Sequence, residues 1–297
     1  YIRRIMEKIK FFSDSCCDIC QEQVEKNDIA IIPIQITHEG RTFREYYDIS
    51  IKNYWKLLEE SEEIPQTTQI TPAQVLECYR TAFDEGYTHM LGIIINGKGS
   101  GSLQSCMIAR EMFYEEYGNS MRIELIDSEA YTFIYGRVLL EACAMRDKGE
   151  RFEDILQVTK SRMRRSETIL GVYTMRHLKK SGRISGAAAF VGEALGFKPI
   201  LEAGKGDVPV IAKVRGEKNL VPKIMELVGK RAVKPETQTA YLLHGNLPEK
   251  TLREVEKEIR KLGFADVKRN PIGVAVTTNI GTQVVAVLFY GEQRPVD

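Results

Sequence analysis

The sequence predicts an α/β protein of two domains. Its 297 residues, 43% of them hydrophobic and 28% charged, have the composition of a soluble globular protein. Up to about residue 166, apolar runs alternate with stretches whose apolar residues recur every three or four positions, which indicates alternating strands and helices with parallel pairing. Beyond that point the pattern changes. We therefore predict an N-terminal three-layer α/β/α domain with a parallel sheet over residues 8–165, and a C-terminal two-layer α/β domain with a mixed sheet over residues 166–297.

The first half is expected to hold four strands and four helices. The strands are predicted at residues 10–13, 29–36, 93–95 and 121–126. The helices are predicted at residues 48–60 and 72–85, after the loop at 96–102, and at residues 131–148. The start of the second helix is the clearest boundary, because Thr71 suits the N-cap, Pro72 the first helical position and Gln74 a capping box. Pro33 indicates an edge or an end within the second strand.

The second half is expected to be a mixture of strands and helices with some antiparallel pairing. Its strands are predicted at residues 169–173, 198–201, 208–214, 239–243, 266–268, 274–278 and 284–290. Its helices are predicted at residues 175–180, 182–195, 217–230 and 248–262. The strands around residues 204–207 (GKGD) form a β-hairpin, because glycine-rich turns of this kind join antiparallel neighbours. The sheet of this half is therefore mixed.

A glycine-serine loop at residues 96–102 (NGKGSGS) joins the central strand to its helix. With Ser100 or Ser102 as cap, the free N–H groups of the helix and the nearby hydroxyls converge at the loop, which suits a carboxylate or a phosphate. Taken alone, the loop is explained equally well as a tight strand-to-helix turn that binds no ligand. The spacing of a P-loop and the third glycine of a dinucleotide motif are both missing, which argues against a nucleotide.

Three polar turns are expected to meet at one edge of the first sheet. They lie at residues 13–15, 97–102 and 127–128, each at the carboxyl end of a predicted strand. In parallel sheets ligands bind at this edge. The coincidence of three turns therefore favours a binding site more strongly than any one of them.

Composition excludes several classes of partner. The 42 basic and 41 acidic residues leave a formal charge of +1, so the chain has no electrostatic footprint for nucleic acid or an anionic membrane. No apolar run approaches the roughly 18 residues that span a bilayer, and residues 1–12 carry charges where a signal peptide would be apolar. We expect a cytoplasmic protein without integral membrane association.

The six cysteines, at positions 16, 17, 20, 78, 106 and 143, do not form the pattern of a disulfide framework and are expected to be reduced thiols. Cys17 and Cys20 have the CxxC spacing of a redox or metal pair. No second pair and no clustered histidine completes four ligands, so we expect no metal site. A redox role stays open, because the pair lies where a helix should begin and a helix N-terminus lowers a thiol pKa.

Short motifs occur in order across nearly the whole chain. They are at residues 13–18 (SDSCCD), 67–72 (TTQITP), 99–105 (GSGSLQS), 127–128 (DS), 178–185 (LKKSGRIS), 197–201 (FKPIL) and 213–215 (KVR). Each is weak alone, but together they resemble the motifs of the DegV family. That resemblance implies a DegV-like fold that holds a long-chain fatty acid between its two domains. It also implies a fatty acid kinase as partner, which phosphorylates the presented carboxylate to an acyl phosphate.

The resemblance also implies which residues bind the head group. Thr67 and Ser100 would bond the carboxylate, with support from Thr68 and from the backbone near Gly101. Without the resemblance, Thr67 would more simply be a loop hydroxyl that bonds its own backbone. Asn279 stands where the family has a histidine that helps to hold the carboxylate. The pocket contour should also differ, because residues 70, 99, 103 and 134 depart from the family pattern.

A basic patch follows the same resemblance. Arg183 stands in a glycine-arginine turn near the site, and Lys179 and Lys180 lie just before it. The patch would dock the partner or its phosphates, since a guanidinium pairs well with phosphate. For the two lysines, an ordinary solvated helix face explains the charge equally well.

No complete catalytic set is visible in the sequence. The four histidines, at positions 38, 89, 177 and 244, fall in no recognised motif, and no catalytic triad or carboxylate pair can be assigned. We therefore predict a non-catalytic lipid-binding protein without a cofactor. The alternatives are an enzyme that binds a phosphate or another small molecule at the helix that begins near Ser100, and a structural scaffold.

Overall fold

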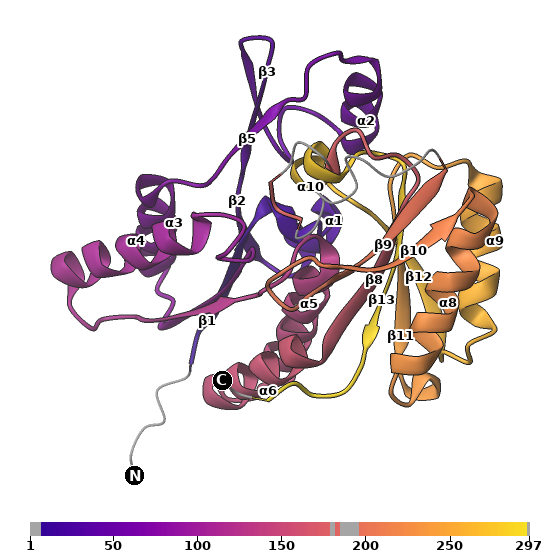
Figure 1. Cartoon of the computed structure of the whole chain (residues 1–297). Coiled ribbons are helices and arrows are strands. Elements are labelled where there is room, and N and C mark those ends of the chain that lie inside the picture. The colour runs from indigo at the N-terminus through magenta and orange to yellow at the C-terminus, as the bar shows by residue number, and fades with distance from the viewer. Residues whose placement is uncertain (1–6, 179–181, 185–195, 296–297) are drawn as a thin grey trace.

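The computed structural model describes residues 7–178, 182–184 and 196–295. Its first sheet is parallel, in the order β2-β1-β6-β7. These strands are β1 (Ile9–Asp14), β2 (Ile29–Ile32), β6 (His89–Ile94) and β7 (Arg122–Asp127). Helices α3 (Pro72–Asp84) and α4 (Ser102–Tyr117) lie on one face, and α5 (Phe133–Asp147) and α6 (Phe152–Arg165) on the other (Figure 1). The predicted parallel three-layer arrangement is confirmed.

The second sheet is mixed and has the order β10-β9-β8-β13-β11-β12, in which only β11 and β12 are parallel. Its strands are β8 (Ser166–Val172), β9 (Phe197–Ala203), β10 (Val210–Arg215), β11 (Thr239–His244), β12 (Asp266–Pro271) and β13 (Val284–Tyr290). Helices α8 (Leu220–Arg231) and α9 (Glu249–Arg260) cover one face (Figure 1). The hairpin and the mixed sheet are confirmed, whereas the division into domains after residue 165 stays a prediction.

A third sheet was not predicted. It is antiparallel, in the order β4-β3-β5, and comprises β3 (Gln35–His38), β4 (Arg41–Arg44) and β5 (Gln66–Thr68). The single strand expected at residues 29–36 is divided at Pro33, which has no N–H to donate to a ladder. The chain therefore leaves the first sheet after β2 and starts the third with β3. Helix α2 (Ile51–Glu60) packs beside this sheet (Figure 1).

The expected strand at residues 274–278 is wrong, because Val274–Ile280 forms helix α10. The β-branched run favours a strand by propensity, but tertiary contacts override it. Val274 packs into a small core with Ile36, Tyr54 and Leu58. The hydroxyls of Thr277 and Thr278 donate to carbonyls of the preceding turn, so these polar groups are satisfied inside a helix.

Most other boundaries agree with the sequence. Thr71 and Gln74 form the expected capping box at the start of α3. Gly101, not a serine, occupies the cap of α4, and the Ser100 hydroxyl accepts from the Ser102 N–H instead. The remaining short helices are α1 (Gln21–Lys26) and three-residue turns at Ser15–Cys17, Glu217–Asn219 and Pro235–Thr237. Most of the helix expected at residues 182–195 lies outside the described residues.

Two buried carboxylates attach helix α10 to the N-terminal part of the chain. The Gly273 N–H donates to Asp18 Oδ2 at 2.7 Å, and the Ala275 N–H donates to Glu45 Oε1 at 3.0 Å. The hydroxyls of Thr132 and Ser15 donate to the same two carboxyl groups. Among the described residues neither carboxylate has an ion pair, so N–H and O–H groups alone compensate its burial.

We predict that stability falls as pH rises from about 4 to about 6. Burial raises the pKa of Asp14 to about 6. Burial, together with repulsion from the Glu45 carboxylate, raises the pKa of Asp18 well above its usual value. In this window the folded state holds protons that the unfolded chain, with a carboxyl pKa of about 4, has released. Below the unfolded pKa the stabilisation is complete, and above the folded pKa it is lost.

Urea unfolding between pH 4 and 7 checks this prediction. Asp18→Asn keeps an oxygen for both donors and should flatten the decline in the midpoint, whereas Asp84→Asn, at an exposed position of α3, should not. If Asp18→Asn shows the same pH dependence as the parent, the buried carboxyl is not its source.

Candidate functional site

The three polar turns predicted at one sheet edge do meet there. The Gly97 N–H donates to Asp127 Oδ1 at 3.1 Å, and the Ile95 N–H donates to Asp14 Oδ2 at 2.7 Å. The Ser13 hydroxyl donates to the Ile93 carbonyl. The polar groups of the first and third turns therefore fix the glycine-serine loop between them.

The glycine-serine loop lies in close contact with the side chains of Tyr131 and Gln69. A Cβ at Gly99 would lie 2.1 Å from the Tyr131 hydroxyl oxygen, and a Cβ at Gly101 would lie 2.1 Å from the amide oxygen of Gln69. The buried Asn96 amide donates to the Tyr131 hydroxyl and so holds that ring in place. A side chain at position 99 would have to displace the Tyr131 ring, whereas one at position 101 would meet only the end of the exposed, flexible Gln69 side chain, so glycine is more strictly favoured at 99.

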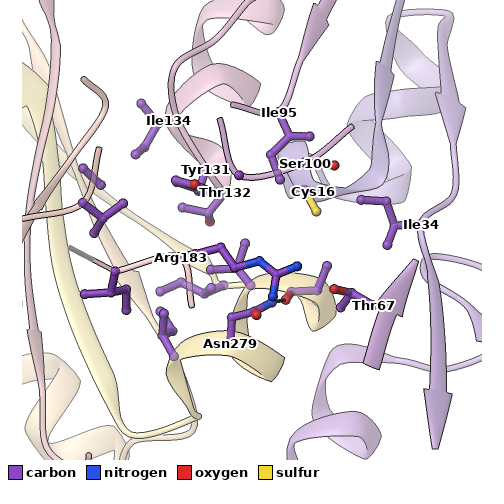
Figure 2. A pocket seen from close by; sticks show the side chains of 18 of the residues that line it. Cys16, Ile34, Thr67, Ile95, Ser100, Tyr131, Thr132, Ile134, Arg183 and Asn279 are labelled. Atoms are coloured by element: carbon purple, nitrogen blue, oxygen red, sulfur yellow. Dashed lines mark hydrogen bonds between the residues drawn. The ribbon is translucent and has the colours of Figure 1, made fainter. Parts of the chain in front are cut away.

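A cavity of about 400 Å³ begins at this loop and extends between the first and second sheets. Its apolar wall includes Ile134, Leu170, Ala203, Val208, Leu243, Ile272, Val284 and Ala286. Its polar lining includes Thr67, Thr68, Ser100, Arg183 and Asn279 (Figure 2). In Figure 2 the side chains of Thr67, Arg183 and Asn279 lie together, with Ile134 across the cavity from them. The cavity is thus apolar over most of its wall and polar at one end.

All five predicted head-group residues line this cavity, from three separate parts of the chain. Thr67 and Thr68 lie on β5, Ser100 and Gly101 in the glycine-serine loop, and Asn279 on α10. Among the described residues the Thr67 hydroxyl makes no hydrogen bond. The bond to its own backbone, which was the alternative for this residue, is therefore absent from the described part of the chain. The Ser100 hydroxyl lies 2.9 Å from the Ser102 hydroxyl, which can orient it.

The side-chain amide of Asn279 already donates one hydrogen bond within α10. Its amide nitrogen donates to the Ala275 carbonyl at 2.9 Å, one turn earlier in α10. An amide carries two N–H donors, so one remains for a group in the cavity. Because the amide is neutral, this end of α10 offers a hydrogen bond without a charge.

A second, polar cavity of about 590 Å³ adjoins the polar end of the first. Both are lined by Thr67, Arg183 and Asn279, and the second also by Glu62 and His177. Arg183, which the sequence assigns to partner docking, is exposed and stands where the two cavities join. Lys179 and Lys180 lie outside the described residues. His177 carries no motif, so sequence reasoning had no signal for its place here.

Burial of Cys17 argues against a redox role for the cysteine pair. Burial raises the pKa of the Cys17 thiol well above its usual value, which disfavours the thiolate needed for redox chemistry. Cys20 is exposed, and both thiols are free. Within the described ranges, no three side chains of the histidine, cysteine or acidic types are placed to hold a metal ion.

The fold and the cavity define a class of ligand-binding α/β proteins, in which an apolar cavity between two sheets ends in polar groups. None of the helices in the described ranges has the length and apolar character needed to cross a bilayer.

Comparison with known proteins identifies the family. The family model "Uncharacterised protein, DegV family" matches residues 8–292. A DegV domain-containing protein of Clostridium acetobutylicum is 30% identical over 287 residues, covering 96% of this chain and 99% of the relative. The chain therefore belongs to the DegV family, as its motifs indicate.

Solved structures share its fold. A DegV family protein from Thermus thermophilus, described as binding fatty acid, matches with a TM-score of 0.84 and 26% identity over 96% of this chain and 100% of that chain. A DegV family protein from Streptococcus agalactiae, also described as fatty-acid-binding, matches with a TM-score of 0.83 and 24% identity over 96% and 99% of the two chains.

Proposed function

We propose that this protein binds a long-chain fatty acid, with the acyl chain in the 400 Å³ cavity and the carboxylate at its polar end. The observation that carries the proposal is the cavity itself, whose wall is largely apolar and also includes the hydroxyls of Thr67 and Ser100 and the amide of Asn279. Donors from a hydroxyl pair and an amide suit a single carboxylate. The fatty-acid binding described for the Thermus thermophilus relative supports the same ligand.

Burial of the acyl chain supplies most of the affinity in this proposal. Each methylene transferred from water contributes about 0.8 kcal/mol, so a dozen contribute on the order of 10 kcal/mol before the costs of association. A hydrogen bond to a charged group contributes about 1.5–3 kcal/mol. The apolar wall therefore sets the affinity, and the polar end sets the orientation.

The proposal includes a partner kinase and no catalytic role for this chain. The polar cavity at the head-group end would leave the carboxylate within reach of a second protein. A kinase would transfer a phosphoryl group from a nucleoside triphosphate to a carboxylate oxygen, giving an acyl phosphate and a nucleoside diphosphate. We assign Arg183 to the approaching phosphoryl group, because its planar fork pairs with phosphate. Lys179 and Lys180 would complete the docking patch. The free thiols suit a cytoplasmic location.

Native mass spectrometry of the purified protein tests the ligand class. We expect a bound species that, on denaturation, is released as a fatty acid. A phosphorylated small molecule in its place would favour an enzyme that uses the helix N-terminus beside Ser100. Protein that stays free of ligand after incubation with fatty acid would favour a scaffold.

Removing one head-group hydroxyl should weaken binding. We expect Ser100→Ala and Thr67→Ala each to cost about 1–3 kcal/mol in fatty-acid binding, measured by titration calorimetry, because each loses a bond to a charged group. Thr37→Ala is the matched control, since Thr37 is half-buried on the adjacent strand β3 and does not line the cavity. Fatty acid methyl esters should also bind less tightly. Parental affinity in both variants and for the ester would place the head group elsewhere.

Position 279 should control the pH dependence of binding. Asn279→His is expected to tighten fatty-acid binding several-fold at pH 6 and less at pH 8, because protonated imidazole adds charge to the hydrogen bond. Asn279→Ala should weaken binding modestly at both pH values, through loss of the amide donor. Weaker binding by the histidine variant at both values would show that this end of α10 is shaped for a different group.

A further inference from the structure

A third cavity, of about 370 Å³, lies apart from the two already described and shares no lining residue with the acyl cavity. One wall comes from α5 and α6, and the other from β11, β13 and the turn before β11. Its charged residues are Arg137, Arg162 and Arg165 on the helices, with Glu141 as the acidic one. Arg137 and Glu141 lie on α5, and the other two on α6. The wall therefore carries a net charge of about +2 at neutral pH.

Both oxygens of Glu141 already contact donors that line this cavity. Its Oε1 accepts from Arg137 Nε at 3.0 Å, and its Oε2 accepts from the Tyr290 hydroxyl at 2.7 Å and forms an ion pair with Arg162 Nε at 3.1 Å. Both oxygens are thus engaged. The outer nitrogens of the arginines receive no carboxylate from within the cavity.

Arg137, which lines the cavity, has a buried donor without an acceptor. Its side chain is buried, with 4% of the residue exposed, and its Nη1 has no hydrogen-bond partner among the described residues. The guanidinium stacks on the Tyr290 ring, with its central carbon 3.8 Å from the ring centroid. Stacking offsets part of the cost of burying the charge, but it gives Nη1 no lone pair to bond.

The other two arginines also have donors with weak partners, although Arg162 Nε is paired with Glu141. Arg162 directs Nη1 at the Met145 sulfur at 3.6 Å, and a thioether is a poor acceptor. Arg165 makes one long bond, of 3.5 Å, from Nε to the Gly291 carbonyl. Three guanidinium groups thus border one cavity with N–H donors that lack good oxygen acceptors.

We propose that this cavity binds a phosphate group, as the free ion or as the phosphate of a small metabolite. A phosphate monoester is close to a dianion at pH 7, so it matches the net charge of +2, which a carboxylate cannot. Its oxygens suit the planar donors of arginine. The Thr239 hydroxyl on the opposite wall offers one more polar group. The volume lies near the lower end for small-molecule sites and limits the organic part to a few atoms.

A bound phosphate would join the two parts of the chain. Arg137 on α5 lies against Tyr290 of β13, and the same two elements send Ile134 and Ala286 into the acyl cavity. An anion here would therefore tie α5 and α6 to the second sheet without contacting the acyl ligand. This inference does not depend on the proposed fatty-acid function.

The test is titration calorimetry of the full-length protein with inorganic phosphate and with glycerol 3-phosphate, at constant ionic strength set with chloride. We expect saturable binding of at least one probe, with sulfate as competitor. Arg165→Gln, which removes a half-buried guanidinium that has one long bond, should weaken it about tenfold or more, and Arg165→Lys by less. Tighter binding of glycerol 3-phosphate than of phosphate would identify a phosphorylated metabolite, and the reverse the free ion.

The matched control is Arg151→Gln. Arg151 immediately precedes α6, is largely exposed and pairs with Asp154, away from the cavity. The control variant should bind like the parent, and both variants should show the parental circular dichroism spectrum. Equal weakening in the two arginine-to-glutamine variants would mean that the protein's general charge attracts the ions. That result, or the absence of saturable binding of both probes by the parent, overturns the proposal.

Discussion

The site depends on the contact between two buried carboxylates and the first turn of α10. Asp18 and Glu45 accept the N–H groups of Gly273 and Ala275, which have no partner within the helix because they are its first donors. The partial positive charge of these groups compensates carboxyl groups that no cation reaches among the described residues. Since α10 carries Asn279 to the cavity, the position of one polar group of the cavity is set by residues more than 200 positions earlier in the chain.

The cavity exists because the two main sheets do not pack directly on each other along their whole length. Helix α5 fills part of the space between them, and the glycine-serine loop and α10 close one end (Figure 1). Strands β8 and β13 supply the apolar wall, through residues such as Leu170 and Ala286. The strands pair their own backbone polar groups in the ladder, so most polar groups free to bind a ligand come from side chains of β5, the glycine-serine loop and α10.

Sequence reasoning succeeded where a general rule fixes the geometry. Parallel pairing brings the carboxyl ends of β1, β6 and β7 to one edge, so the meeting of the turns at 13–15, 97–102 and 127–128 follows from strand order. It failed for α10, because long-range contacts to Asp18 and Glu45 decide between helix and strand there. The third sheet was missed because its strands are three or four residues long and mostly polar. No local pattern could show that Arg137 and His177 line cavities, since the opposite walls come from distant segments.

The third sheet covers a small hydrophobic core of its own, so the free energy of local unfolding differs between this part of the molecule and the two main sheets. Ile36, Tyr54, Leu58 and Val274 form a cluster separate from the larger cores of the two main sheets. With so little buried apolar area, this cluster ranks among the least costly parts of the fold to open. Thr67 pairs with Ile36 across β3 and β5, and Asn279 lies on the same helix as Val274, so one side of the polar end borders this cluster, whereas the apolar wall belongs largely to the large core. Amide hydrogens of β3, β5 and α10 should therefore exchange with solvent sooner than those of β8 and β13.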